Sequence, residues 1–500
     1  MYSSYSSLQQ SQLAAQGYYD TQSTYLLVYA PGRSTALRAT LADQLHRKFR
    51  LADTLGSALT EGVDGVLLVS EDVECMSTAL MCFAKALQDG ADYAVCNAVF
   101  GFGGATALYQ SRAHLAQNRC ALVSRPLLER CRAAAKDPEN VTELLALAAQ
   151  FCAHPARIPQ ALLHYERDIC AEDAFSAHGK RAFIMSHVLD MTGAPIVLVS
   201  AVPVLRSMGY EVLVLGPSDG GSLHLFLDAG ASVITRSSCR NVSDAWGMAL
   251  CADFVIVNTV VMARAVRALS GTAVPVLWWL HDAFAGYPHI AHQIPTKLAE
   301  NVRLYSVGHH AANAMHAVRP DFQIGQLIYG LPDYAAEDFP RCDLGYPADK
   351  PLFATVGSFE RRKGHDIFCA AIRLLPEEVR NKATFLFVGM AADKEMMDAV
   401  RSLTTDCPEN VFYCKRLSRD EIKNLMEQCT CLVCASRDDP MPTFVTEGLI
   451  FGKPSIVSEH TGTAGVITEG WTVSPTPTTT RRSWPHCWSG PSSTRRSWPP

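Results

Sequence analysis

Three adjacent cations in the last third of the chain form the first group of residues that could do chemistry. Arg361, Arg362 and Lys363 lie in the segment Gly357–Gly364, between a run typical of a strand and a run typical of a helix. The free N–H groups and the dipole of a helix start favour anions, and glycines let the backbone approach a ligand closely. The segment therefore indicates a diphosphate site, although a solvated basic turn would have the same composition.

Two carboxylates eight residues apart form the second group, in the segment Ser436–Glu447. The intervening turn can put Asp439 at a strand end and Glu447 one turn inside the next helix. Carboxylates in such a pocket accept hydrogen bonds from hydroxyl groups. Thr443 and Phe444 stand where the N-terminal amides of that helix would meet a phosphate. A helix N-cap flanked by surface acids is the alternative that these residues leave open.

The elements that position these residues follow an α/β pattern, in which short apolar runs alternate with segments of helical periodicity. Such alternation favours a parallel, doubly wound sheet. We expect a leader at 1–24, α/β domains at 25–165, 181–330 and 350–473, and a tail at 474–500. The length of 500 residues agrees with two or three domains.

The tail differs from the rest of the chain, because no Ala, Val, Ile, Leu or Met follows Val473. The run Arg481–Pro485 recurs as Arg495–Pro499. A segment without aliphatic residues has no apolar helix face to pack. A disordered tail, translation out of frame in place of the natural C-terminus, and a functional basic tail all remain open.

Composition excludes several classes of protein. The net charge of -5 gives no general reason to bind nucleic acid. The longest apolar stretches, Ala194–Leu205 and Thr272–Leu280, are shorter than the roughly 20 residues of a membrane span. We see no signal peptide, and 17 irregularly spaced cysteines indicate reduced thiols. We therefore expect a cytoplasmic protein without a transmembrane segment, while peripheral association with a membrane stays open.

The two chemical segments together resemble the donor-binding half of a glycosyltransferase of family four, which has the GT-B fold of two Rossmann-like lobes. The family pattern is a glycine after a strand, a loop ending in Lys-Gly, then Ser-x-x-Glu-x7-Glu, then Gly-x-Pro-x-Ile. The matching residues here are Gly357, Lys363, Gly364, Ser436, Asp439, Glu447 and Gly452–Ile456. Their order and spacing make this resemblance specific.

The resemblance implies a role for each matching residue. Lys363, with Arg361 or Arg362, would hold the diphosphate of a nucleotide-sugar donor, and Glu447 would bind the ribose hydroxyls. Asp439 stands where the family usually has Glu, and it would contact the transferred sugar. Its side chain is one methylene shorter, which would affect donor preference or activity.

The acceptor side of the same family is similar to residues 181–330. Gly193, in a loop after a predicted strand, would let the backbone approach the donor phosphates and the acceptor. His281 ends a later predicted strand and would position the reacting sugar, with Asp282 as its orienting partner. A structural hydrogen bond is the alternative for this His-Asp pair.

The first domain, 25–165, resembles glycosyltransferases of family two, which have the GT-A fold. The apolar run Gly65–Ser70 ends in Glu71 and Asp72, where that family has a metal-binding Asp-x-Asp. Oxygen ligands of this kind could hold Mg or Mn. Asn140 stands where the family has an acid that accepts a proton, which an amide nitrogen cannot do. We therefore expect a degenerate GT-A-like domain.

Together the resemblances imply a hexosyltransferase-type enzyme. It would move a sugar from a UDP- or GDP-sugar to a polysaccharide, another glycan or a lipid-linked acceptor, with retention at the anomeric carbon. Cations and helix amides would stabilise the leaving diphosphate, so the GT-B module would need no cofactor. A nucleotide-sugar epimerase of GT-B fold is one alternative. A catalytically inactive sugar-nucleotide-binding or scaffold protein is the other.

Overall fold

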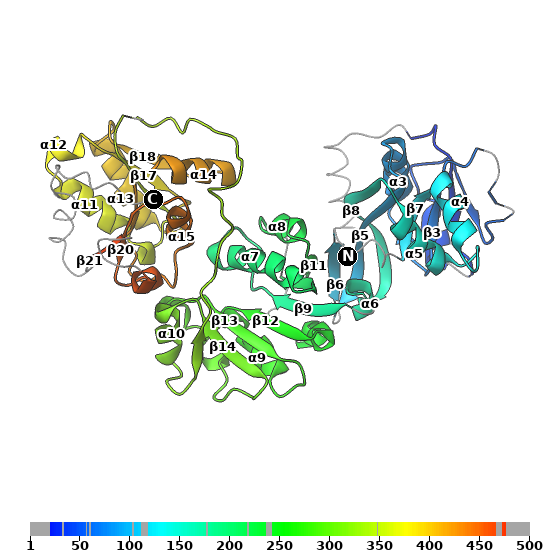
Figure 1. Ribbon diagram of the computed structural model, residues 1–500, viewed down its shortest axis with the longest axis horizontal. Coiled ribbons are helices and arrows are strands. Elements are labelled where there is room, and N and C mark those ends of the chain that lie inside the picture. The colour runs from blue at the N-terminus through cyan, green and yellow to red at the C-terminus, as the bar shows by residue number, and fades with distance from the viewer. Residues whose placement is uncertain are drawn as a thin grey trace. The chain divides into compact units, whose positions relative to one another are not determined.

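The computed structural model describes residues 21–32, 35–56, 58–59, 62–102, 105–111, 119–176, 179–217, 220–236, 243–347, 349–466 and 473–476. The chain divides into two compact units, whose helices and strands are labelled in Figure 1. Unit 1 comprises Met1–Val257 and Arg264–Val276, and unit 2 comprises Asn258–Ala263 and Leu277–Pro500. The predicted leader lies outside the described residues up to position 20, and Thr21 is already buried against His46, 2.9 Å from its Nδ1.

Unit 1 begins with a mixed sheet. Its strands are β1 (Leu26–Tyr29), β2 (Phe49–Ala52), β3 (Gly65–Val69), β4 (Glu74–Cys75), β5 (Tyr93–Phe102), β6 (Ala105–Ser111), β7 (Cys120–Ser124) and β8 (Pro155–Asp168). The helices are α2 (Thr35–Leu41), α3 (Ala79–Gln88), α4 (Arg125–Ala134), α5 (Val141–Phe151) and α6 (Ala171–Ala174). Every residue of β3 is buried, as expected for a continuous apolar run between two layers of helices.

The second part of unit 1 continues the same sheet. It adds β9 (Lys180–Met185), β10 (Tyr210–Gly216), β11 (Ser232–Thr235) and β12 (Phe254–Asn258), with α7 (Gly193–Ser207), α8 (Leu223–Asp228), the 3-10 helix η1 (Ser243–Cys251) and α9 (Ala263–Leu269). Strand β11 pairs antiparallel with β6, so the order is β12-β9-β10-β11-β6-β5-β7-β3-β1-β2. Residues of the predicted domains 25–165 and 181–330 therefore share one sheet, which the sequence did not indicate, and residues 277–330 of the second predicted domain belong to unit 2.

Unit 2 contains a second sheet of six parallel strands. Its strands are β16 (Leu352–Val356), β17 (Thr384–Val388), β18 (Val411–Cys414), β19 (Cys431–Cys434), β20 (Ser455–Ser458) and β21 (Val473–Thr476). Its helices are α11 (His365–Leu374), α12 (Glu377–Arg380), α13 (Lys394–Asp406), α14 (Arg419–Gln428) and α15 (Thr443–Ile450). The order β18-β17-β16-β19-β20-β21 is that of a doubly wound sheet, which confirms the predicted fold class. Strand β21 extends into the predicted tail, and the remainder of that tail lies outside the described residues.

Both faces of this sheet are covered. One core contains Phe368, Val400 and the inward side chains of α11 and α13, and the other contains Leu425, Val445 and those of α14 and α15. Strands β17 and β19 are buried on both faces, as central parallel strands are. The strand order reverses between β16 and β19, and ligands of such folds bind beside the carboxyl ends of the strands at this point.

The rest of unit 2 precedes this sheet in the chain. It holds β13 (Val276–Leu280, whose first residue belongs to unit 1), β14 (Val302–Ser306), β15 (Ile324–Gln326), α10 (His309–His316) and the 3-10 helix η3 (Phe284–Gly286). Strands β14 and β15 are parallel.

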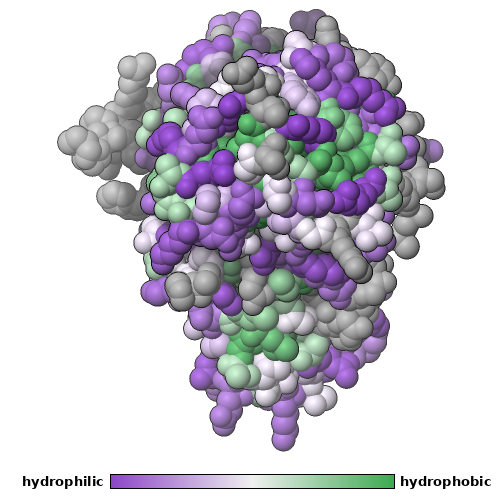
Figure 2. Space-filling model, turned by 90° about the vertical axis from the view of Figure 1, so that its right-hand side faces the viewer, coloured by the Kyte–Doolittle hydropathy of each residue, from purple (hydrophilic) through white to green (hydrophobic). Residues whose placement is uncertain are grey.

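The surface is mainly hydrophilic on the side shown in Figure 2, with a few separate hydrophobic areas. Among the helices that the structure describes, none combines the length and the apolar character needed to cross a bilayer.

Candidate functional site

The two chemical segments of the sequence meet at the switch point of the second sheet. The first follows β16 and the second follows β19, and these strands are neighbours. The backbone N–H of Arg437 donates to the carbonyl of Arg362 at 2.7 Å, and the N–H of Asp438 donates to the same oxygen at 3.3 Å. Main-chain hydrogen bonds thus hold the basic loop against the acidic turn.

An ion pair reinforces this junction. The guanidinium of Arg437 donates to both carboxylate oxygens of Asp366, at 2.8 and 2.6 Å, and to the carbonyl of Arg361 at 2.8 Å. Asp366 lies in the first turn of α11, where the helix dipole also favours a negative charge. Burial acts to raise the pKa of Asp366, but the bonds from Arg437 hold it below its usual value.

Gly364 makes the close approach of the two loops possible. Its φ is +68°, and a Cβ at this position would lie 2.0 Å from the carbonyl oxygen of Ala435. We expect Gly364→Ala to lower the free energy of unfolding by about 3 kcal/mol or more, because steric overlap adds to the cost of a left-handed residue. Chemical denaturation would measure the change.

Gly452→Ala is the matched control for that substitution. Its φ of +65° is nearly the same, but no atom lies within 4 Å of the added Cβ. We expect this variant to lose only about 1 kcal/mol. Equal losses at the two glycines would show that the contact with Ala435 is not a constraint.

Lys363 and Asp439 form an ion pair inside the junction. The Nζ atom lies 2.6 Å from Oδ2, and the two side chains are 18% and 4% exposed. The backbone of Asp439 donates to the carbonyl of His460 and accepts from the N–H of Gly462. The cation predicted for the diphosphate and the acid predicted for the sugar are therefore direct neighbours.

The two arginines beside Lys363 differ in their surroundings. Arg362 donates from Nε to Oε2 of Glu360 at 2.7 Å, and the hydroxyl of Ser358 donates to the other oxygen. Burial acts to raise the pKa of Glu360, and these bonds lower it below its usual value. Within the described part of the chain, no acidic partner of Arg361 is seen, and its side chain is exposed. The sequence analysis did not single out Glu360. The available signal was an acidic residue directly before three basic ones.

Glu447 is buried on α15 and has a cationic partner that the sequence did not indicate. Its Oε1 accepts from Nη1 of Arg419 at 2.8 Å, and the Glu447 side chain is 8% exposed. The guanidinium of Arg419 lies over the ring of Tyr334, 5.0 Å from its centroid. Arg419 begins α14, directly after the helix cap Ser418, so only packing brings it to Glu447.

The charges of the Asp439 and Glu447 carboxylates affect the hydroxyl of the buried residue Tyr329. Burial raises its pKa above the usual value, and the charges of Asp439 and Glu447 act in the same direction. This hydroxyl donates to the carbonyl of Met441 at 3.1 Å. Lys363 and Asp439 are direct neighbours, and Glu447 lies on the helix that follows the turn of Asp439.

The remaining predicted donor residues support the loops of this region. Ser436 is 1% exposed, and its carbonyl accepts from the hydroxyl of Ser458. Thr443 begins α15, while the side chain of Phe444 packs in the core. The N–H of Gly357 donates to the carbonyl of Val388. Contact of these residues with a donor stays a prediction.

His281 and Asp282 follow β13 as predicted, but Asp282 is bonded to backbone groups. Its Oδ2 accepts from the N–H of Val260 at 2.6 Å, and the backbone of His281 also donates to the carboxylate. The imidazole of His281 packs on Trp279, with ring centroids 4.7 Å apart. The role of His281 with a sugar stays a prediction.

Desolvation by the surrounding protein raises the pKa of Asp282 to about 7, although the residue keeps some contact with solvent. The folded chain then binds a proton that the unfolded chain releases near pH 4. We expect stability to fall as pH rises from about 4 to 7, and Asp282→Asn to flatten this part of the profile.

Urea unfolding of both proteins across this pH range would measure the effect. Asp253→Asn is the control, because Asp253 is an exposed carboxylate that accepts a backbone N–H from Arg181 at 2.7 Å. An Asp282→Asn profile parallel to that of the wild type would contradict the prediction.

Gly193 lies in unit 1, at the first position of α7. The preceding residue, Thr192, donates its backbone N–H to Asp190 at 3.1 Å, which orders the turn before the helix. Contact of Gly193 with a donor or an acceptor stays a prediction.

The acids of the first domain are engaged by protein groups. Glu71 pairs with Arg167 at 2.7 Å, and Asp72 accepts the N–H groups of Ala36 and Leu37 at the start of α2. Over the described residues, no cluster of three or more His, Cys, Asp or Glu side chains could hold a metal ion. Binding of Mg or Mn by Glu71 and Asp72 stays a prediction. Asn140 caps α5 by accepting the N–H of Glu143.

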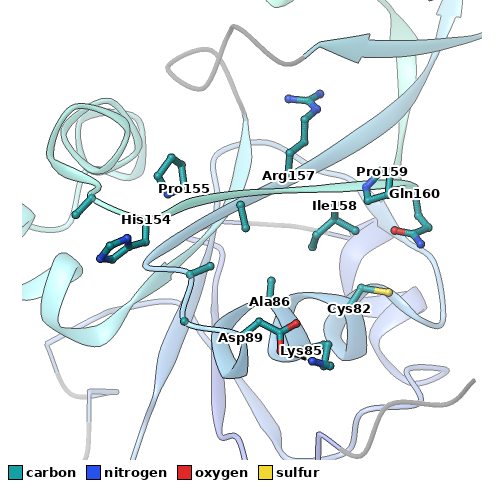
Figure 3. Close-up of a pocket in the computed structure, with 14 residues that line it drawn as sticks. Cys82, Lys85, Ala86, Asp89, His154, Pro155, Arg157, Ile158, Pro159 and Gln160 are labelled. Carbon is teal, nitrogen blue, oxygen red and sulfur yellow. Dashed lines mark hydrogen bonds and ion pairs between the residues drawn. The ribbon is translucent and has the colours of Figure 1, made fainter. Parts of the chain in front are cut away.

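The first domain also has an open groove with a volume of about 730 Å³ between α3 and the first residues of β8. Figure 3 shows Ile158 on the side of the strand that faces α3 and Arg157 on the other side. Arg157 donates to Asn97 at 3.0 Å. None of the predicted site residues lines this groove.

Comparisons with known proteins agree with this architecture. Residues 178–316 match the family described as Glycosyl-transferase family 4, and residues 338–477 match Glycosyl transferases group 1. The predicted resemblance to family four is thereby confirmed for these residues. The resemblance of 25–165 to family two stays a prediction.

Solved structures of HepE from Anabaena share the fold. The complex with UDP and glucose has a TM-score of 0.51 and 17% identity, over 62% of this chain and 89% of that one. The complex with UDP-glucose has a TM-score of 0.50 and 14% identity, over 62% and 88%.

A curated relative is granule-bound starch synthase 1 of Triticum aestivum, 26% identical over 134 residues. That match covers 26% of this chain and 21% of the relative, so it spans about a fifth of the relative's length. Residues 178–316 of this chain therefore resemble the glycosyl-transferase family 4, residues 338–477 resemble the glycosyl transferases group 1, and the chain has a fold of the GT-B type.

Proposed function

We propose that this protein transfers a hexose from a UDP- or GDP-sugar to a glycan or lipid-linked acceptor, with retention at the anomeric carbon. The observation that carries the proposal is the half-buried Lys363–Asp439 pair at the switch point of the donor lobe, in the turn that precedes the helix of Glu447. HepE, a protein of the same fold, binds UDP and UDP-glucose, which supports a nucleotide-sugar donor for this chain.

The chemistry follows from the charges of this region. When the bond between sugar and diphosphate breaks, negative charge grows on the leaving phosphate. Lys363 and the exposed Arg361, together with the N–H groups at the start of α11, would stabilise that charge. Preorganised cations of this kind provide the stabilisation without a metal ion in the donor lobe.

Two residues would recognise the rest of the donor. The Asp439 carboxylate would accept hydrogen bonds from hydroxyls of the sugar, and Glu447 would accept those of the ribose. His281 would position the reacting sugar, and Gly193 would allow close approach of the backbone to the phosphates. Since no protein nucleophile is assigned, the acceptor hydroxyl would attack the anomeric carbon on the face from which the nucleoside diphosphate leaves, and its proton would pass to the leaving phosphate oxygen.

The test is incubation of the purified chain with UDP- and GDP-sugars, with and without oligosaccharide and lipid-linked acceptors. We expect release of nucleoside diphosphate that depends on the acceptor, and NMR of the product should show a retained anomeric configuration. Inversion at C2 of the sugar nucleotide would instead establish an epimerase. Binding without turnover would establish an inactive sugar-nucleotide-binding or scaffold protein.

We place this reaction in the cytoplasm. All cysteines that the structure describes are free thiols, and thiols persist in a reducing compartment. For residues 25–165 we propose a degenerate GT-A-like domain, because Arg167 neutralises Glu71 and Asn140 serves as a helix cap. Stimulation of transfer by Mg or Mn would contradict this part of the proposal.

A further inference from the structure

Asp438 stands directly before Asp439 in the turn after β19, yet its carboxylate binds a different part of unit 2. Oδ1 lies 2.7 Å from Nε2 of His310, at the start of α10. The backbone N–H groups of Phe284 and Ala285, in η3, donate to Oδ1 and Oδ2 at 3.2 and 2.9 Å. Three donors that precede the donor lobe in the chain therefore converge on one side chain of its acidic turn.

Burial and charge make this contact strong. The side chains of His310 and Asp438 are 13% and 14% exposed, so water competes little for their bond. Burial acts to raise the pKa of Asp438, but the bonds from His310 and the two amides hold it below its usual value. The ring of Phe284 packs edge to face on His310, with centroids 5.2 Å apart.

Asp438 is also coupled to the loop that carries Lys363. The N–H of Asp438 donates to the carbonyl of Arg362, and the carbonyl oxygen of Asp438 lies 3.5 Å from Nη1 of Arg362. Asp439 follows directly in the chain and pairs with Lys363. A displacement of Asp438 would therefore move both members of that pair.

We propose that Asp438, held by His310 and by the amides of Phe284 and Ala285, is a positioning residue that sets the placement of Asp439 and Lys363 for sugar transfer. This inference rests on the proposed function and deepens it. The two neighbouring acids have different partners. Asp439 pairs with Lys363 inside the donor lobe, whereas Asp438 binds the segment that precedes the lobe in the chain. Misplaced reacting groups slow the chemical step much more than they weaken donor binding.

The test compares the wild type with Asp438→Ala, His310→Ala and the double variant. Each single substitution should lower kcat about tenfold while KM for the nucleotide sugar changes less than about twofold. Because both side chains act through one contact, the double variant should be no slower than the slower single variant. His310→Gln keeps a donor near the position of Nε2 and should recover most of the activity.

Hydrogen exchange gives a readout that does not depend on turnover. In Asp438→Ala the amides of Phe284 and Ala285 lose their acceptor and should exchange faster than in the wild type. Asp406→Ala is the matched control, because Asp406 forms an exposed ion pair with Arg373 in the same lobe. It should change neither kcat nor exchange at these amides.

The outcomes separate the two proposals. An active wild type whose kcat is unchanged in Asp438→Ala, or single effects that multiply in the double variant, would overturn the positioning role and leave the proposed function intact. Unchanged exchange at Phe284 and Ala285 would overturn the contact itself. A wild type without transfer would overturn the proposed function, and the positioning role with it.

Discussion

UDP binding should weaken by about 100-fold when Lys363 is replaced by alanine, while uridine binding should change by less than about threefold. Two effects act together on the diphosphate. The variant loses a cation beside the phosphate site, and it leaves the carboxylate of Asp439, which is 4% exposed, without its ion-pair partner. An uncompensated negative charge at this place repels a diphosphate, whereas a nucleoside without phosphate meets neither effect. Isothermal titration calorimetry with UDP and uridine would measure both affinities.

A second substitution separates the two effects. In the Lys363→Ala/Asp439→Asn double variant the repulsion is gone, so UDP binding should recover by about tenfold relative to Lys363→Ala alone. Lys382→Ala is the matched control, since it removes an exposed lysine of the same lobe and should leave both affinities unchanged. Equal losses of UDP and uridine binding in Lys363→Ala would refute the phosphate role of this lysine.

Glu447→Gln should weaken UDP and uridine binding by the same factor, about 30-fold. Ribose is common to both ligands, and a carboxylate can accept from both of its hydroxyls, whereas an amide offers only one oxygen. The substitution also leaves the guanidinium of Arg419 without its carboxylate partner. The same titrations measure the effect, and thermal unfolding reports how much stability the lost ion pair costs.

Glu427→Gln provides the comparison for this variant, because Glu427 also pairs with an arginine, Arg341, but at an exposed position of the same lobe. It should bind both ligands as the wild type does. A loss confined to UDP in Glu447→Gln would place this acid near the phosphates and would contradict its assignment to the ribose.

Much of the fold of the donor lobe could be predicted from local sequence. The apolar run Leu352–Val356 predicts a strand and Thr443–Ile450 predicts a helix, and these are the bounds of β16 and α15. Helix α12 and strand β21 were not predicted. A short continuous apolar run is typical of a strand buried on both faces of a sheet, and segments of helical periodicity form the helices that cover that sheet. By contrast, the pairing of β11 with β6 was not predictable, because hydrogen bonding between strands far apart in the chain leaves no local pattern.

The sequence by itself determined which residues are chemically able to act, since the order and spacing of Gly357, Lys363, Asp439 and Glu447 are carried by the chain. Only the tertiary structure decided which charges meet. Lys363 pairs with Asp439 across 76 positions, Glu447 with Arg419 across 28, and Asp438 with His310 across 128. From the sequence alone, any of the cations 361–363 could pair with either of the acids 438 and 439. Backbone packing around Gly364 and the direction of each side chain select one of them, because ion-pair strength depends on a separation that sequence does not contain.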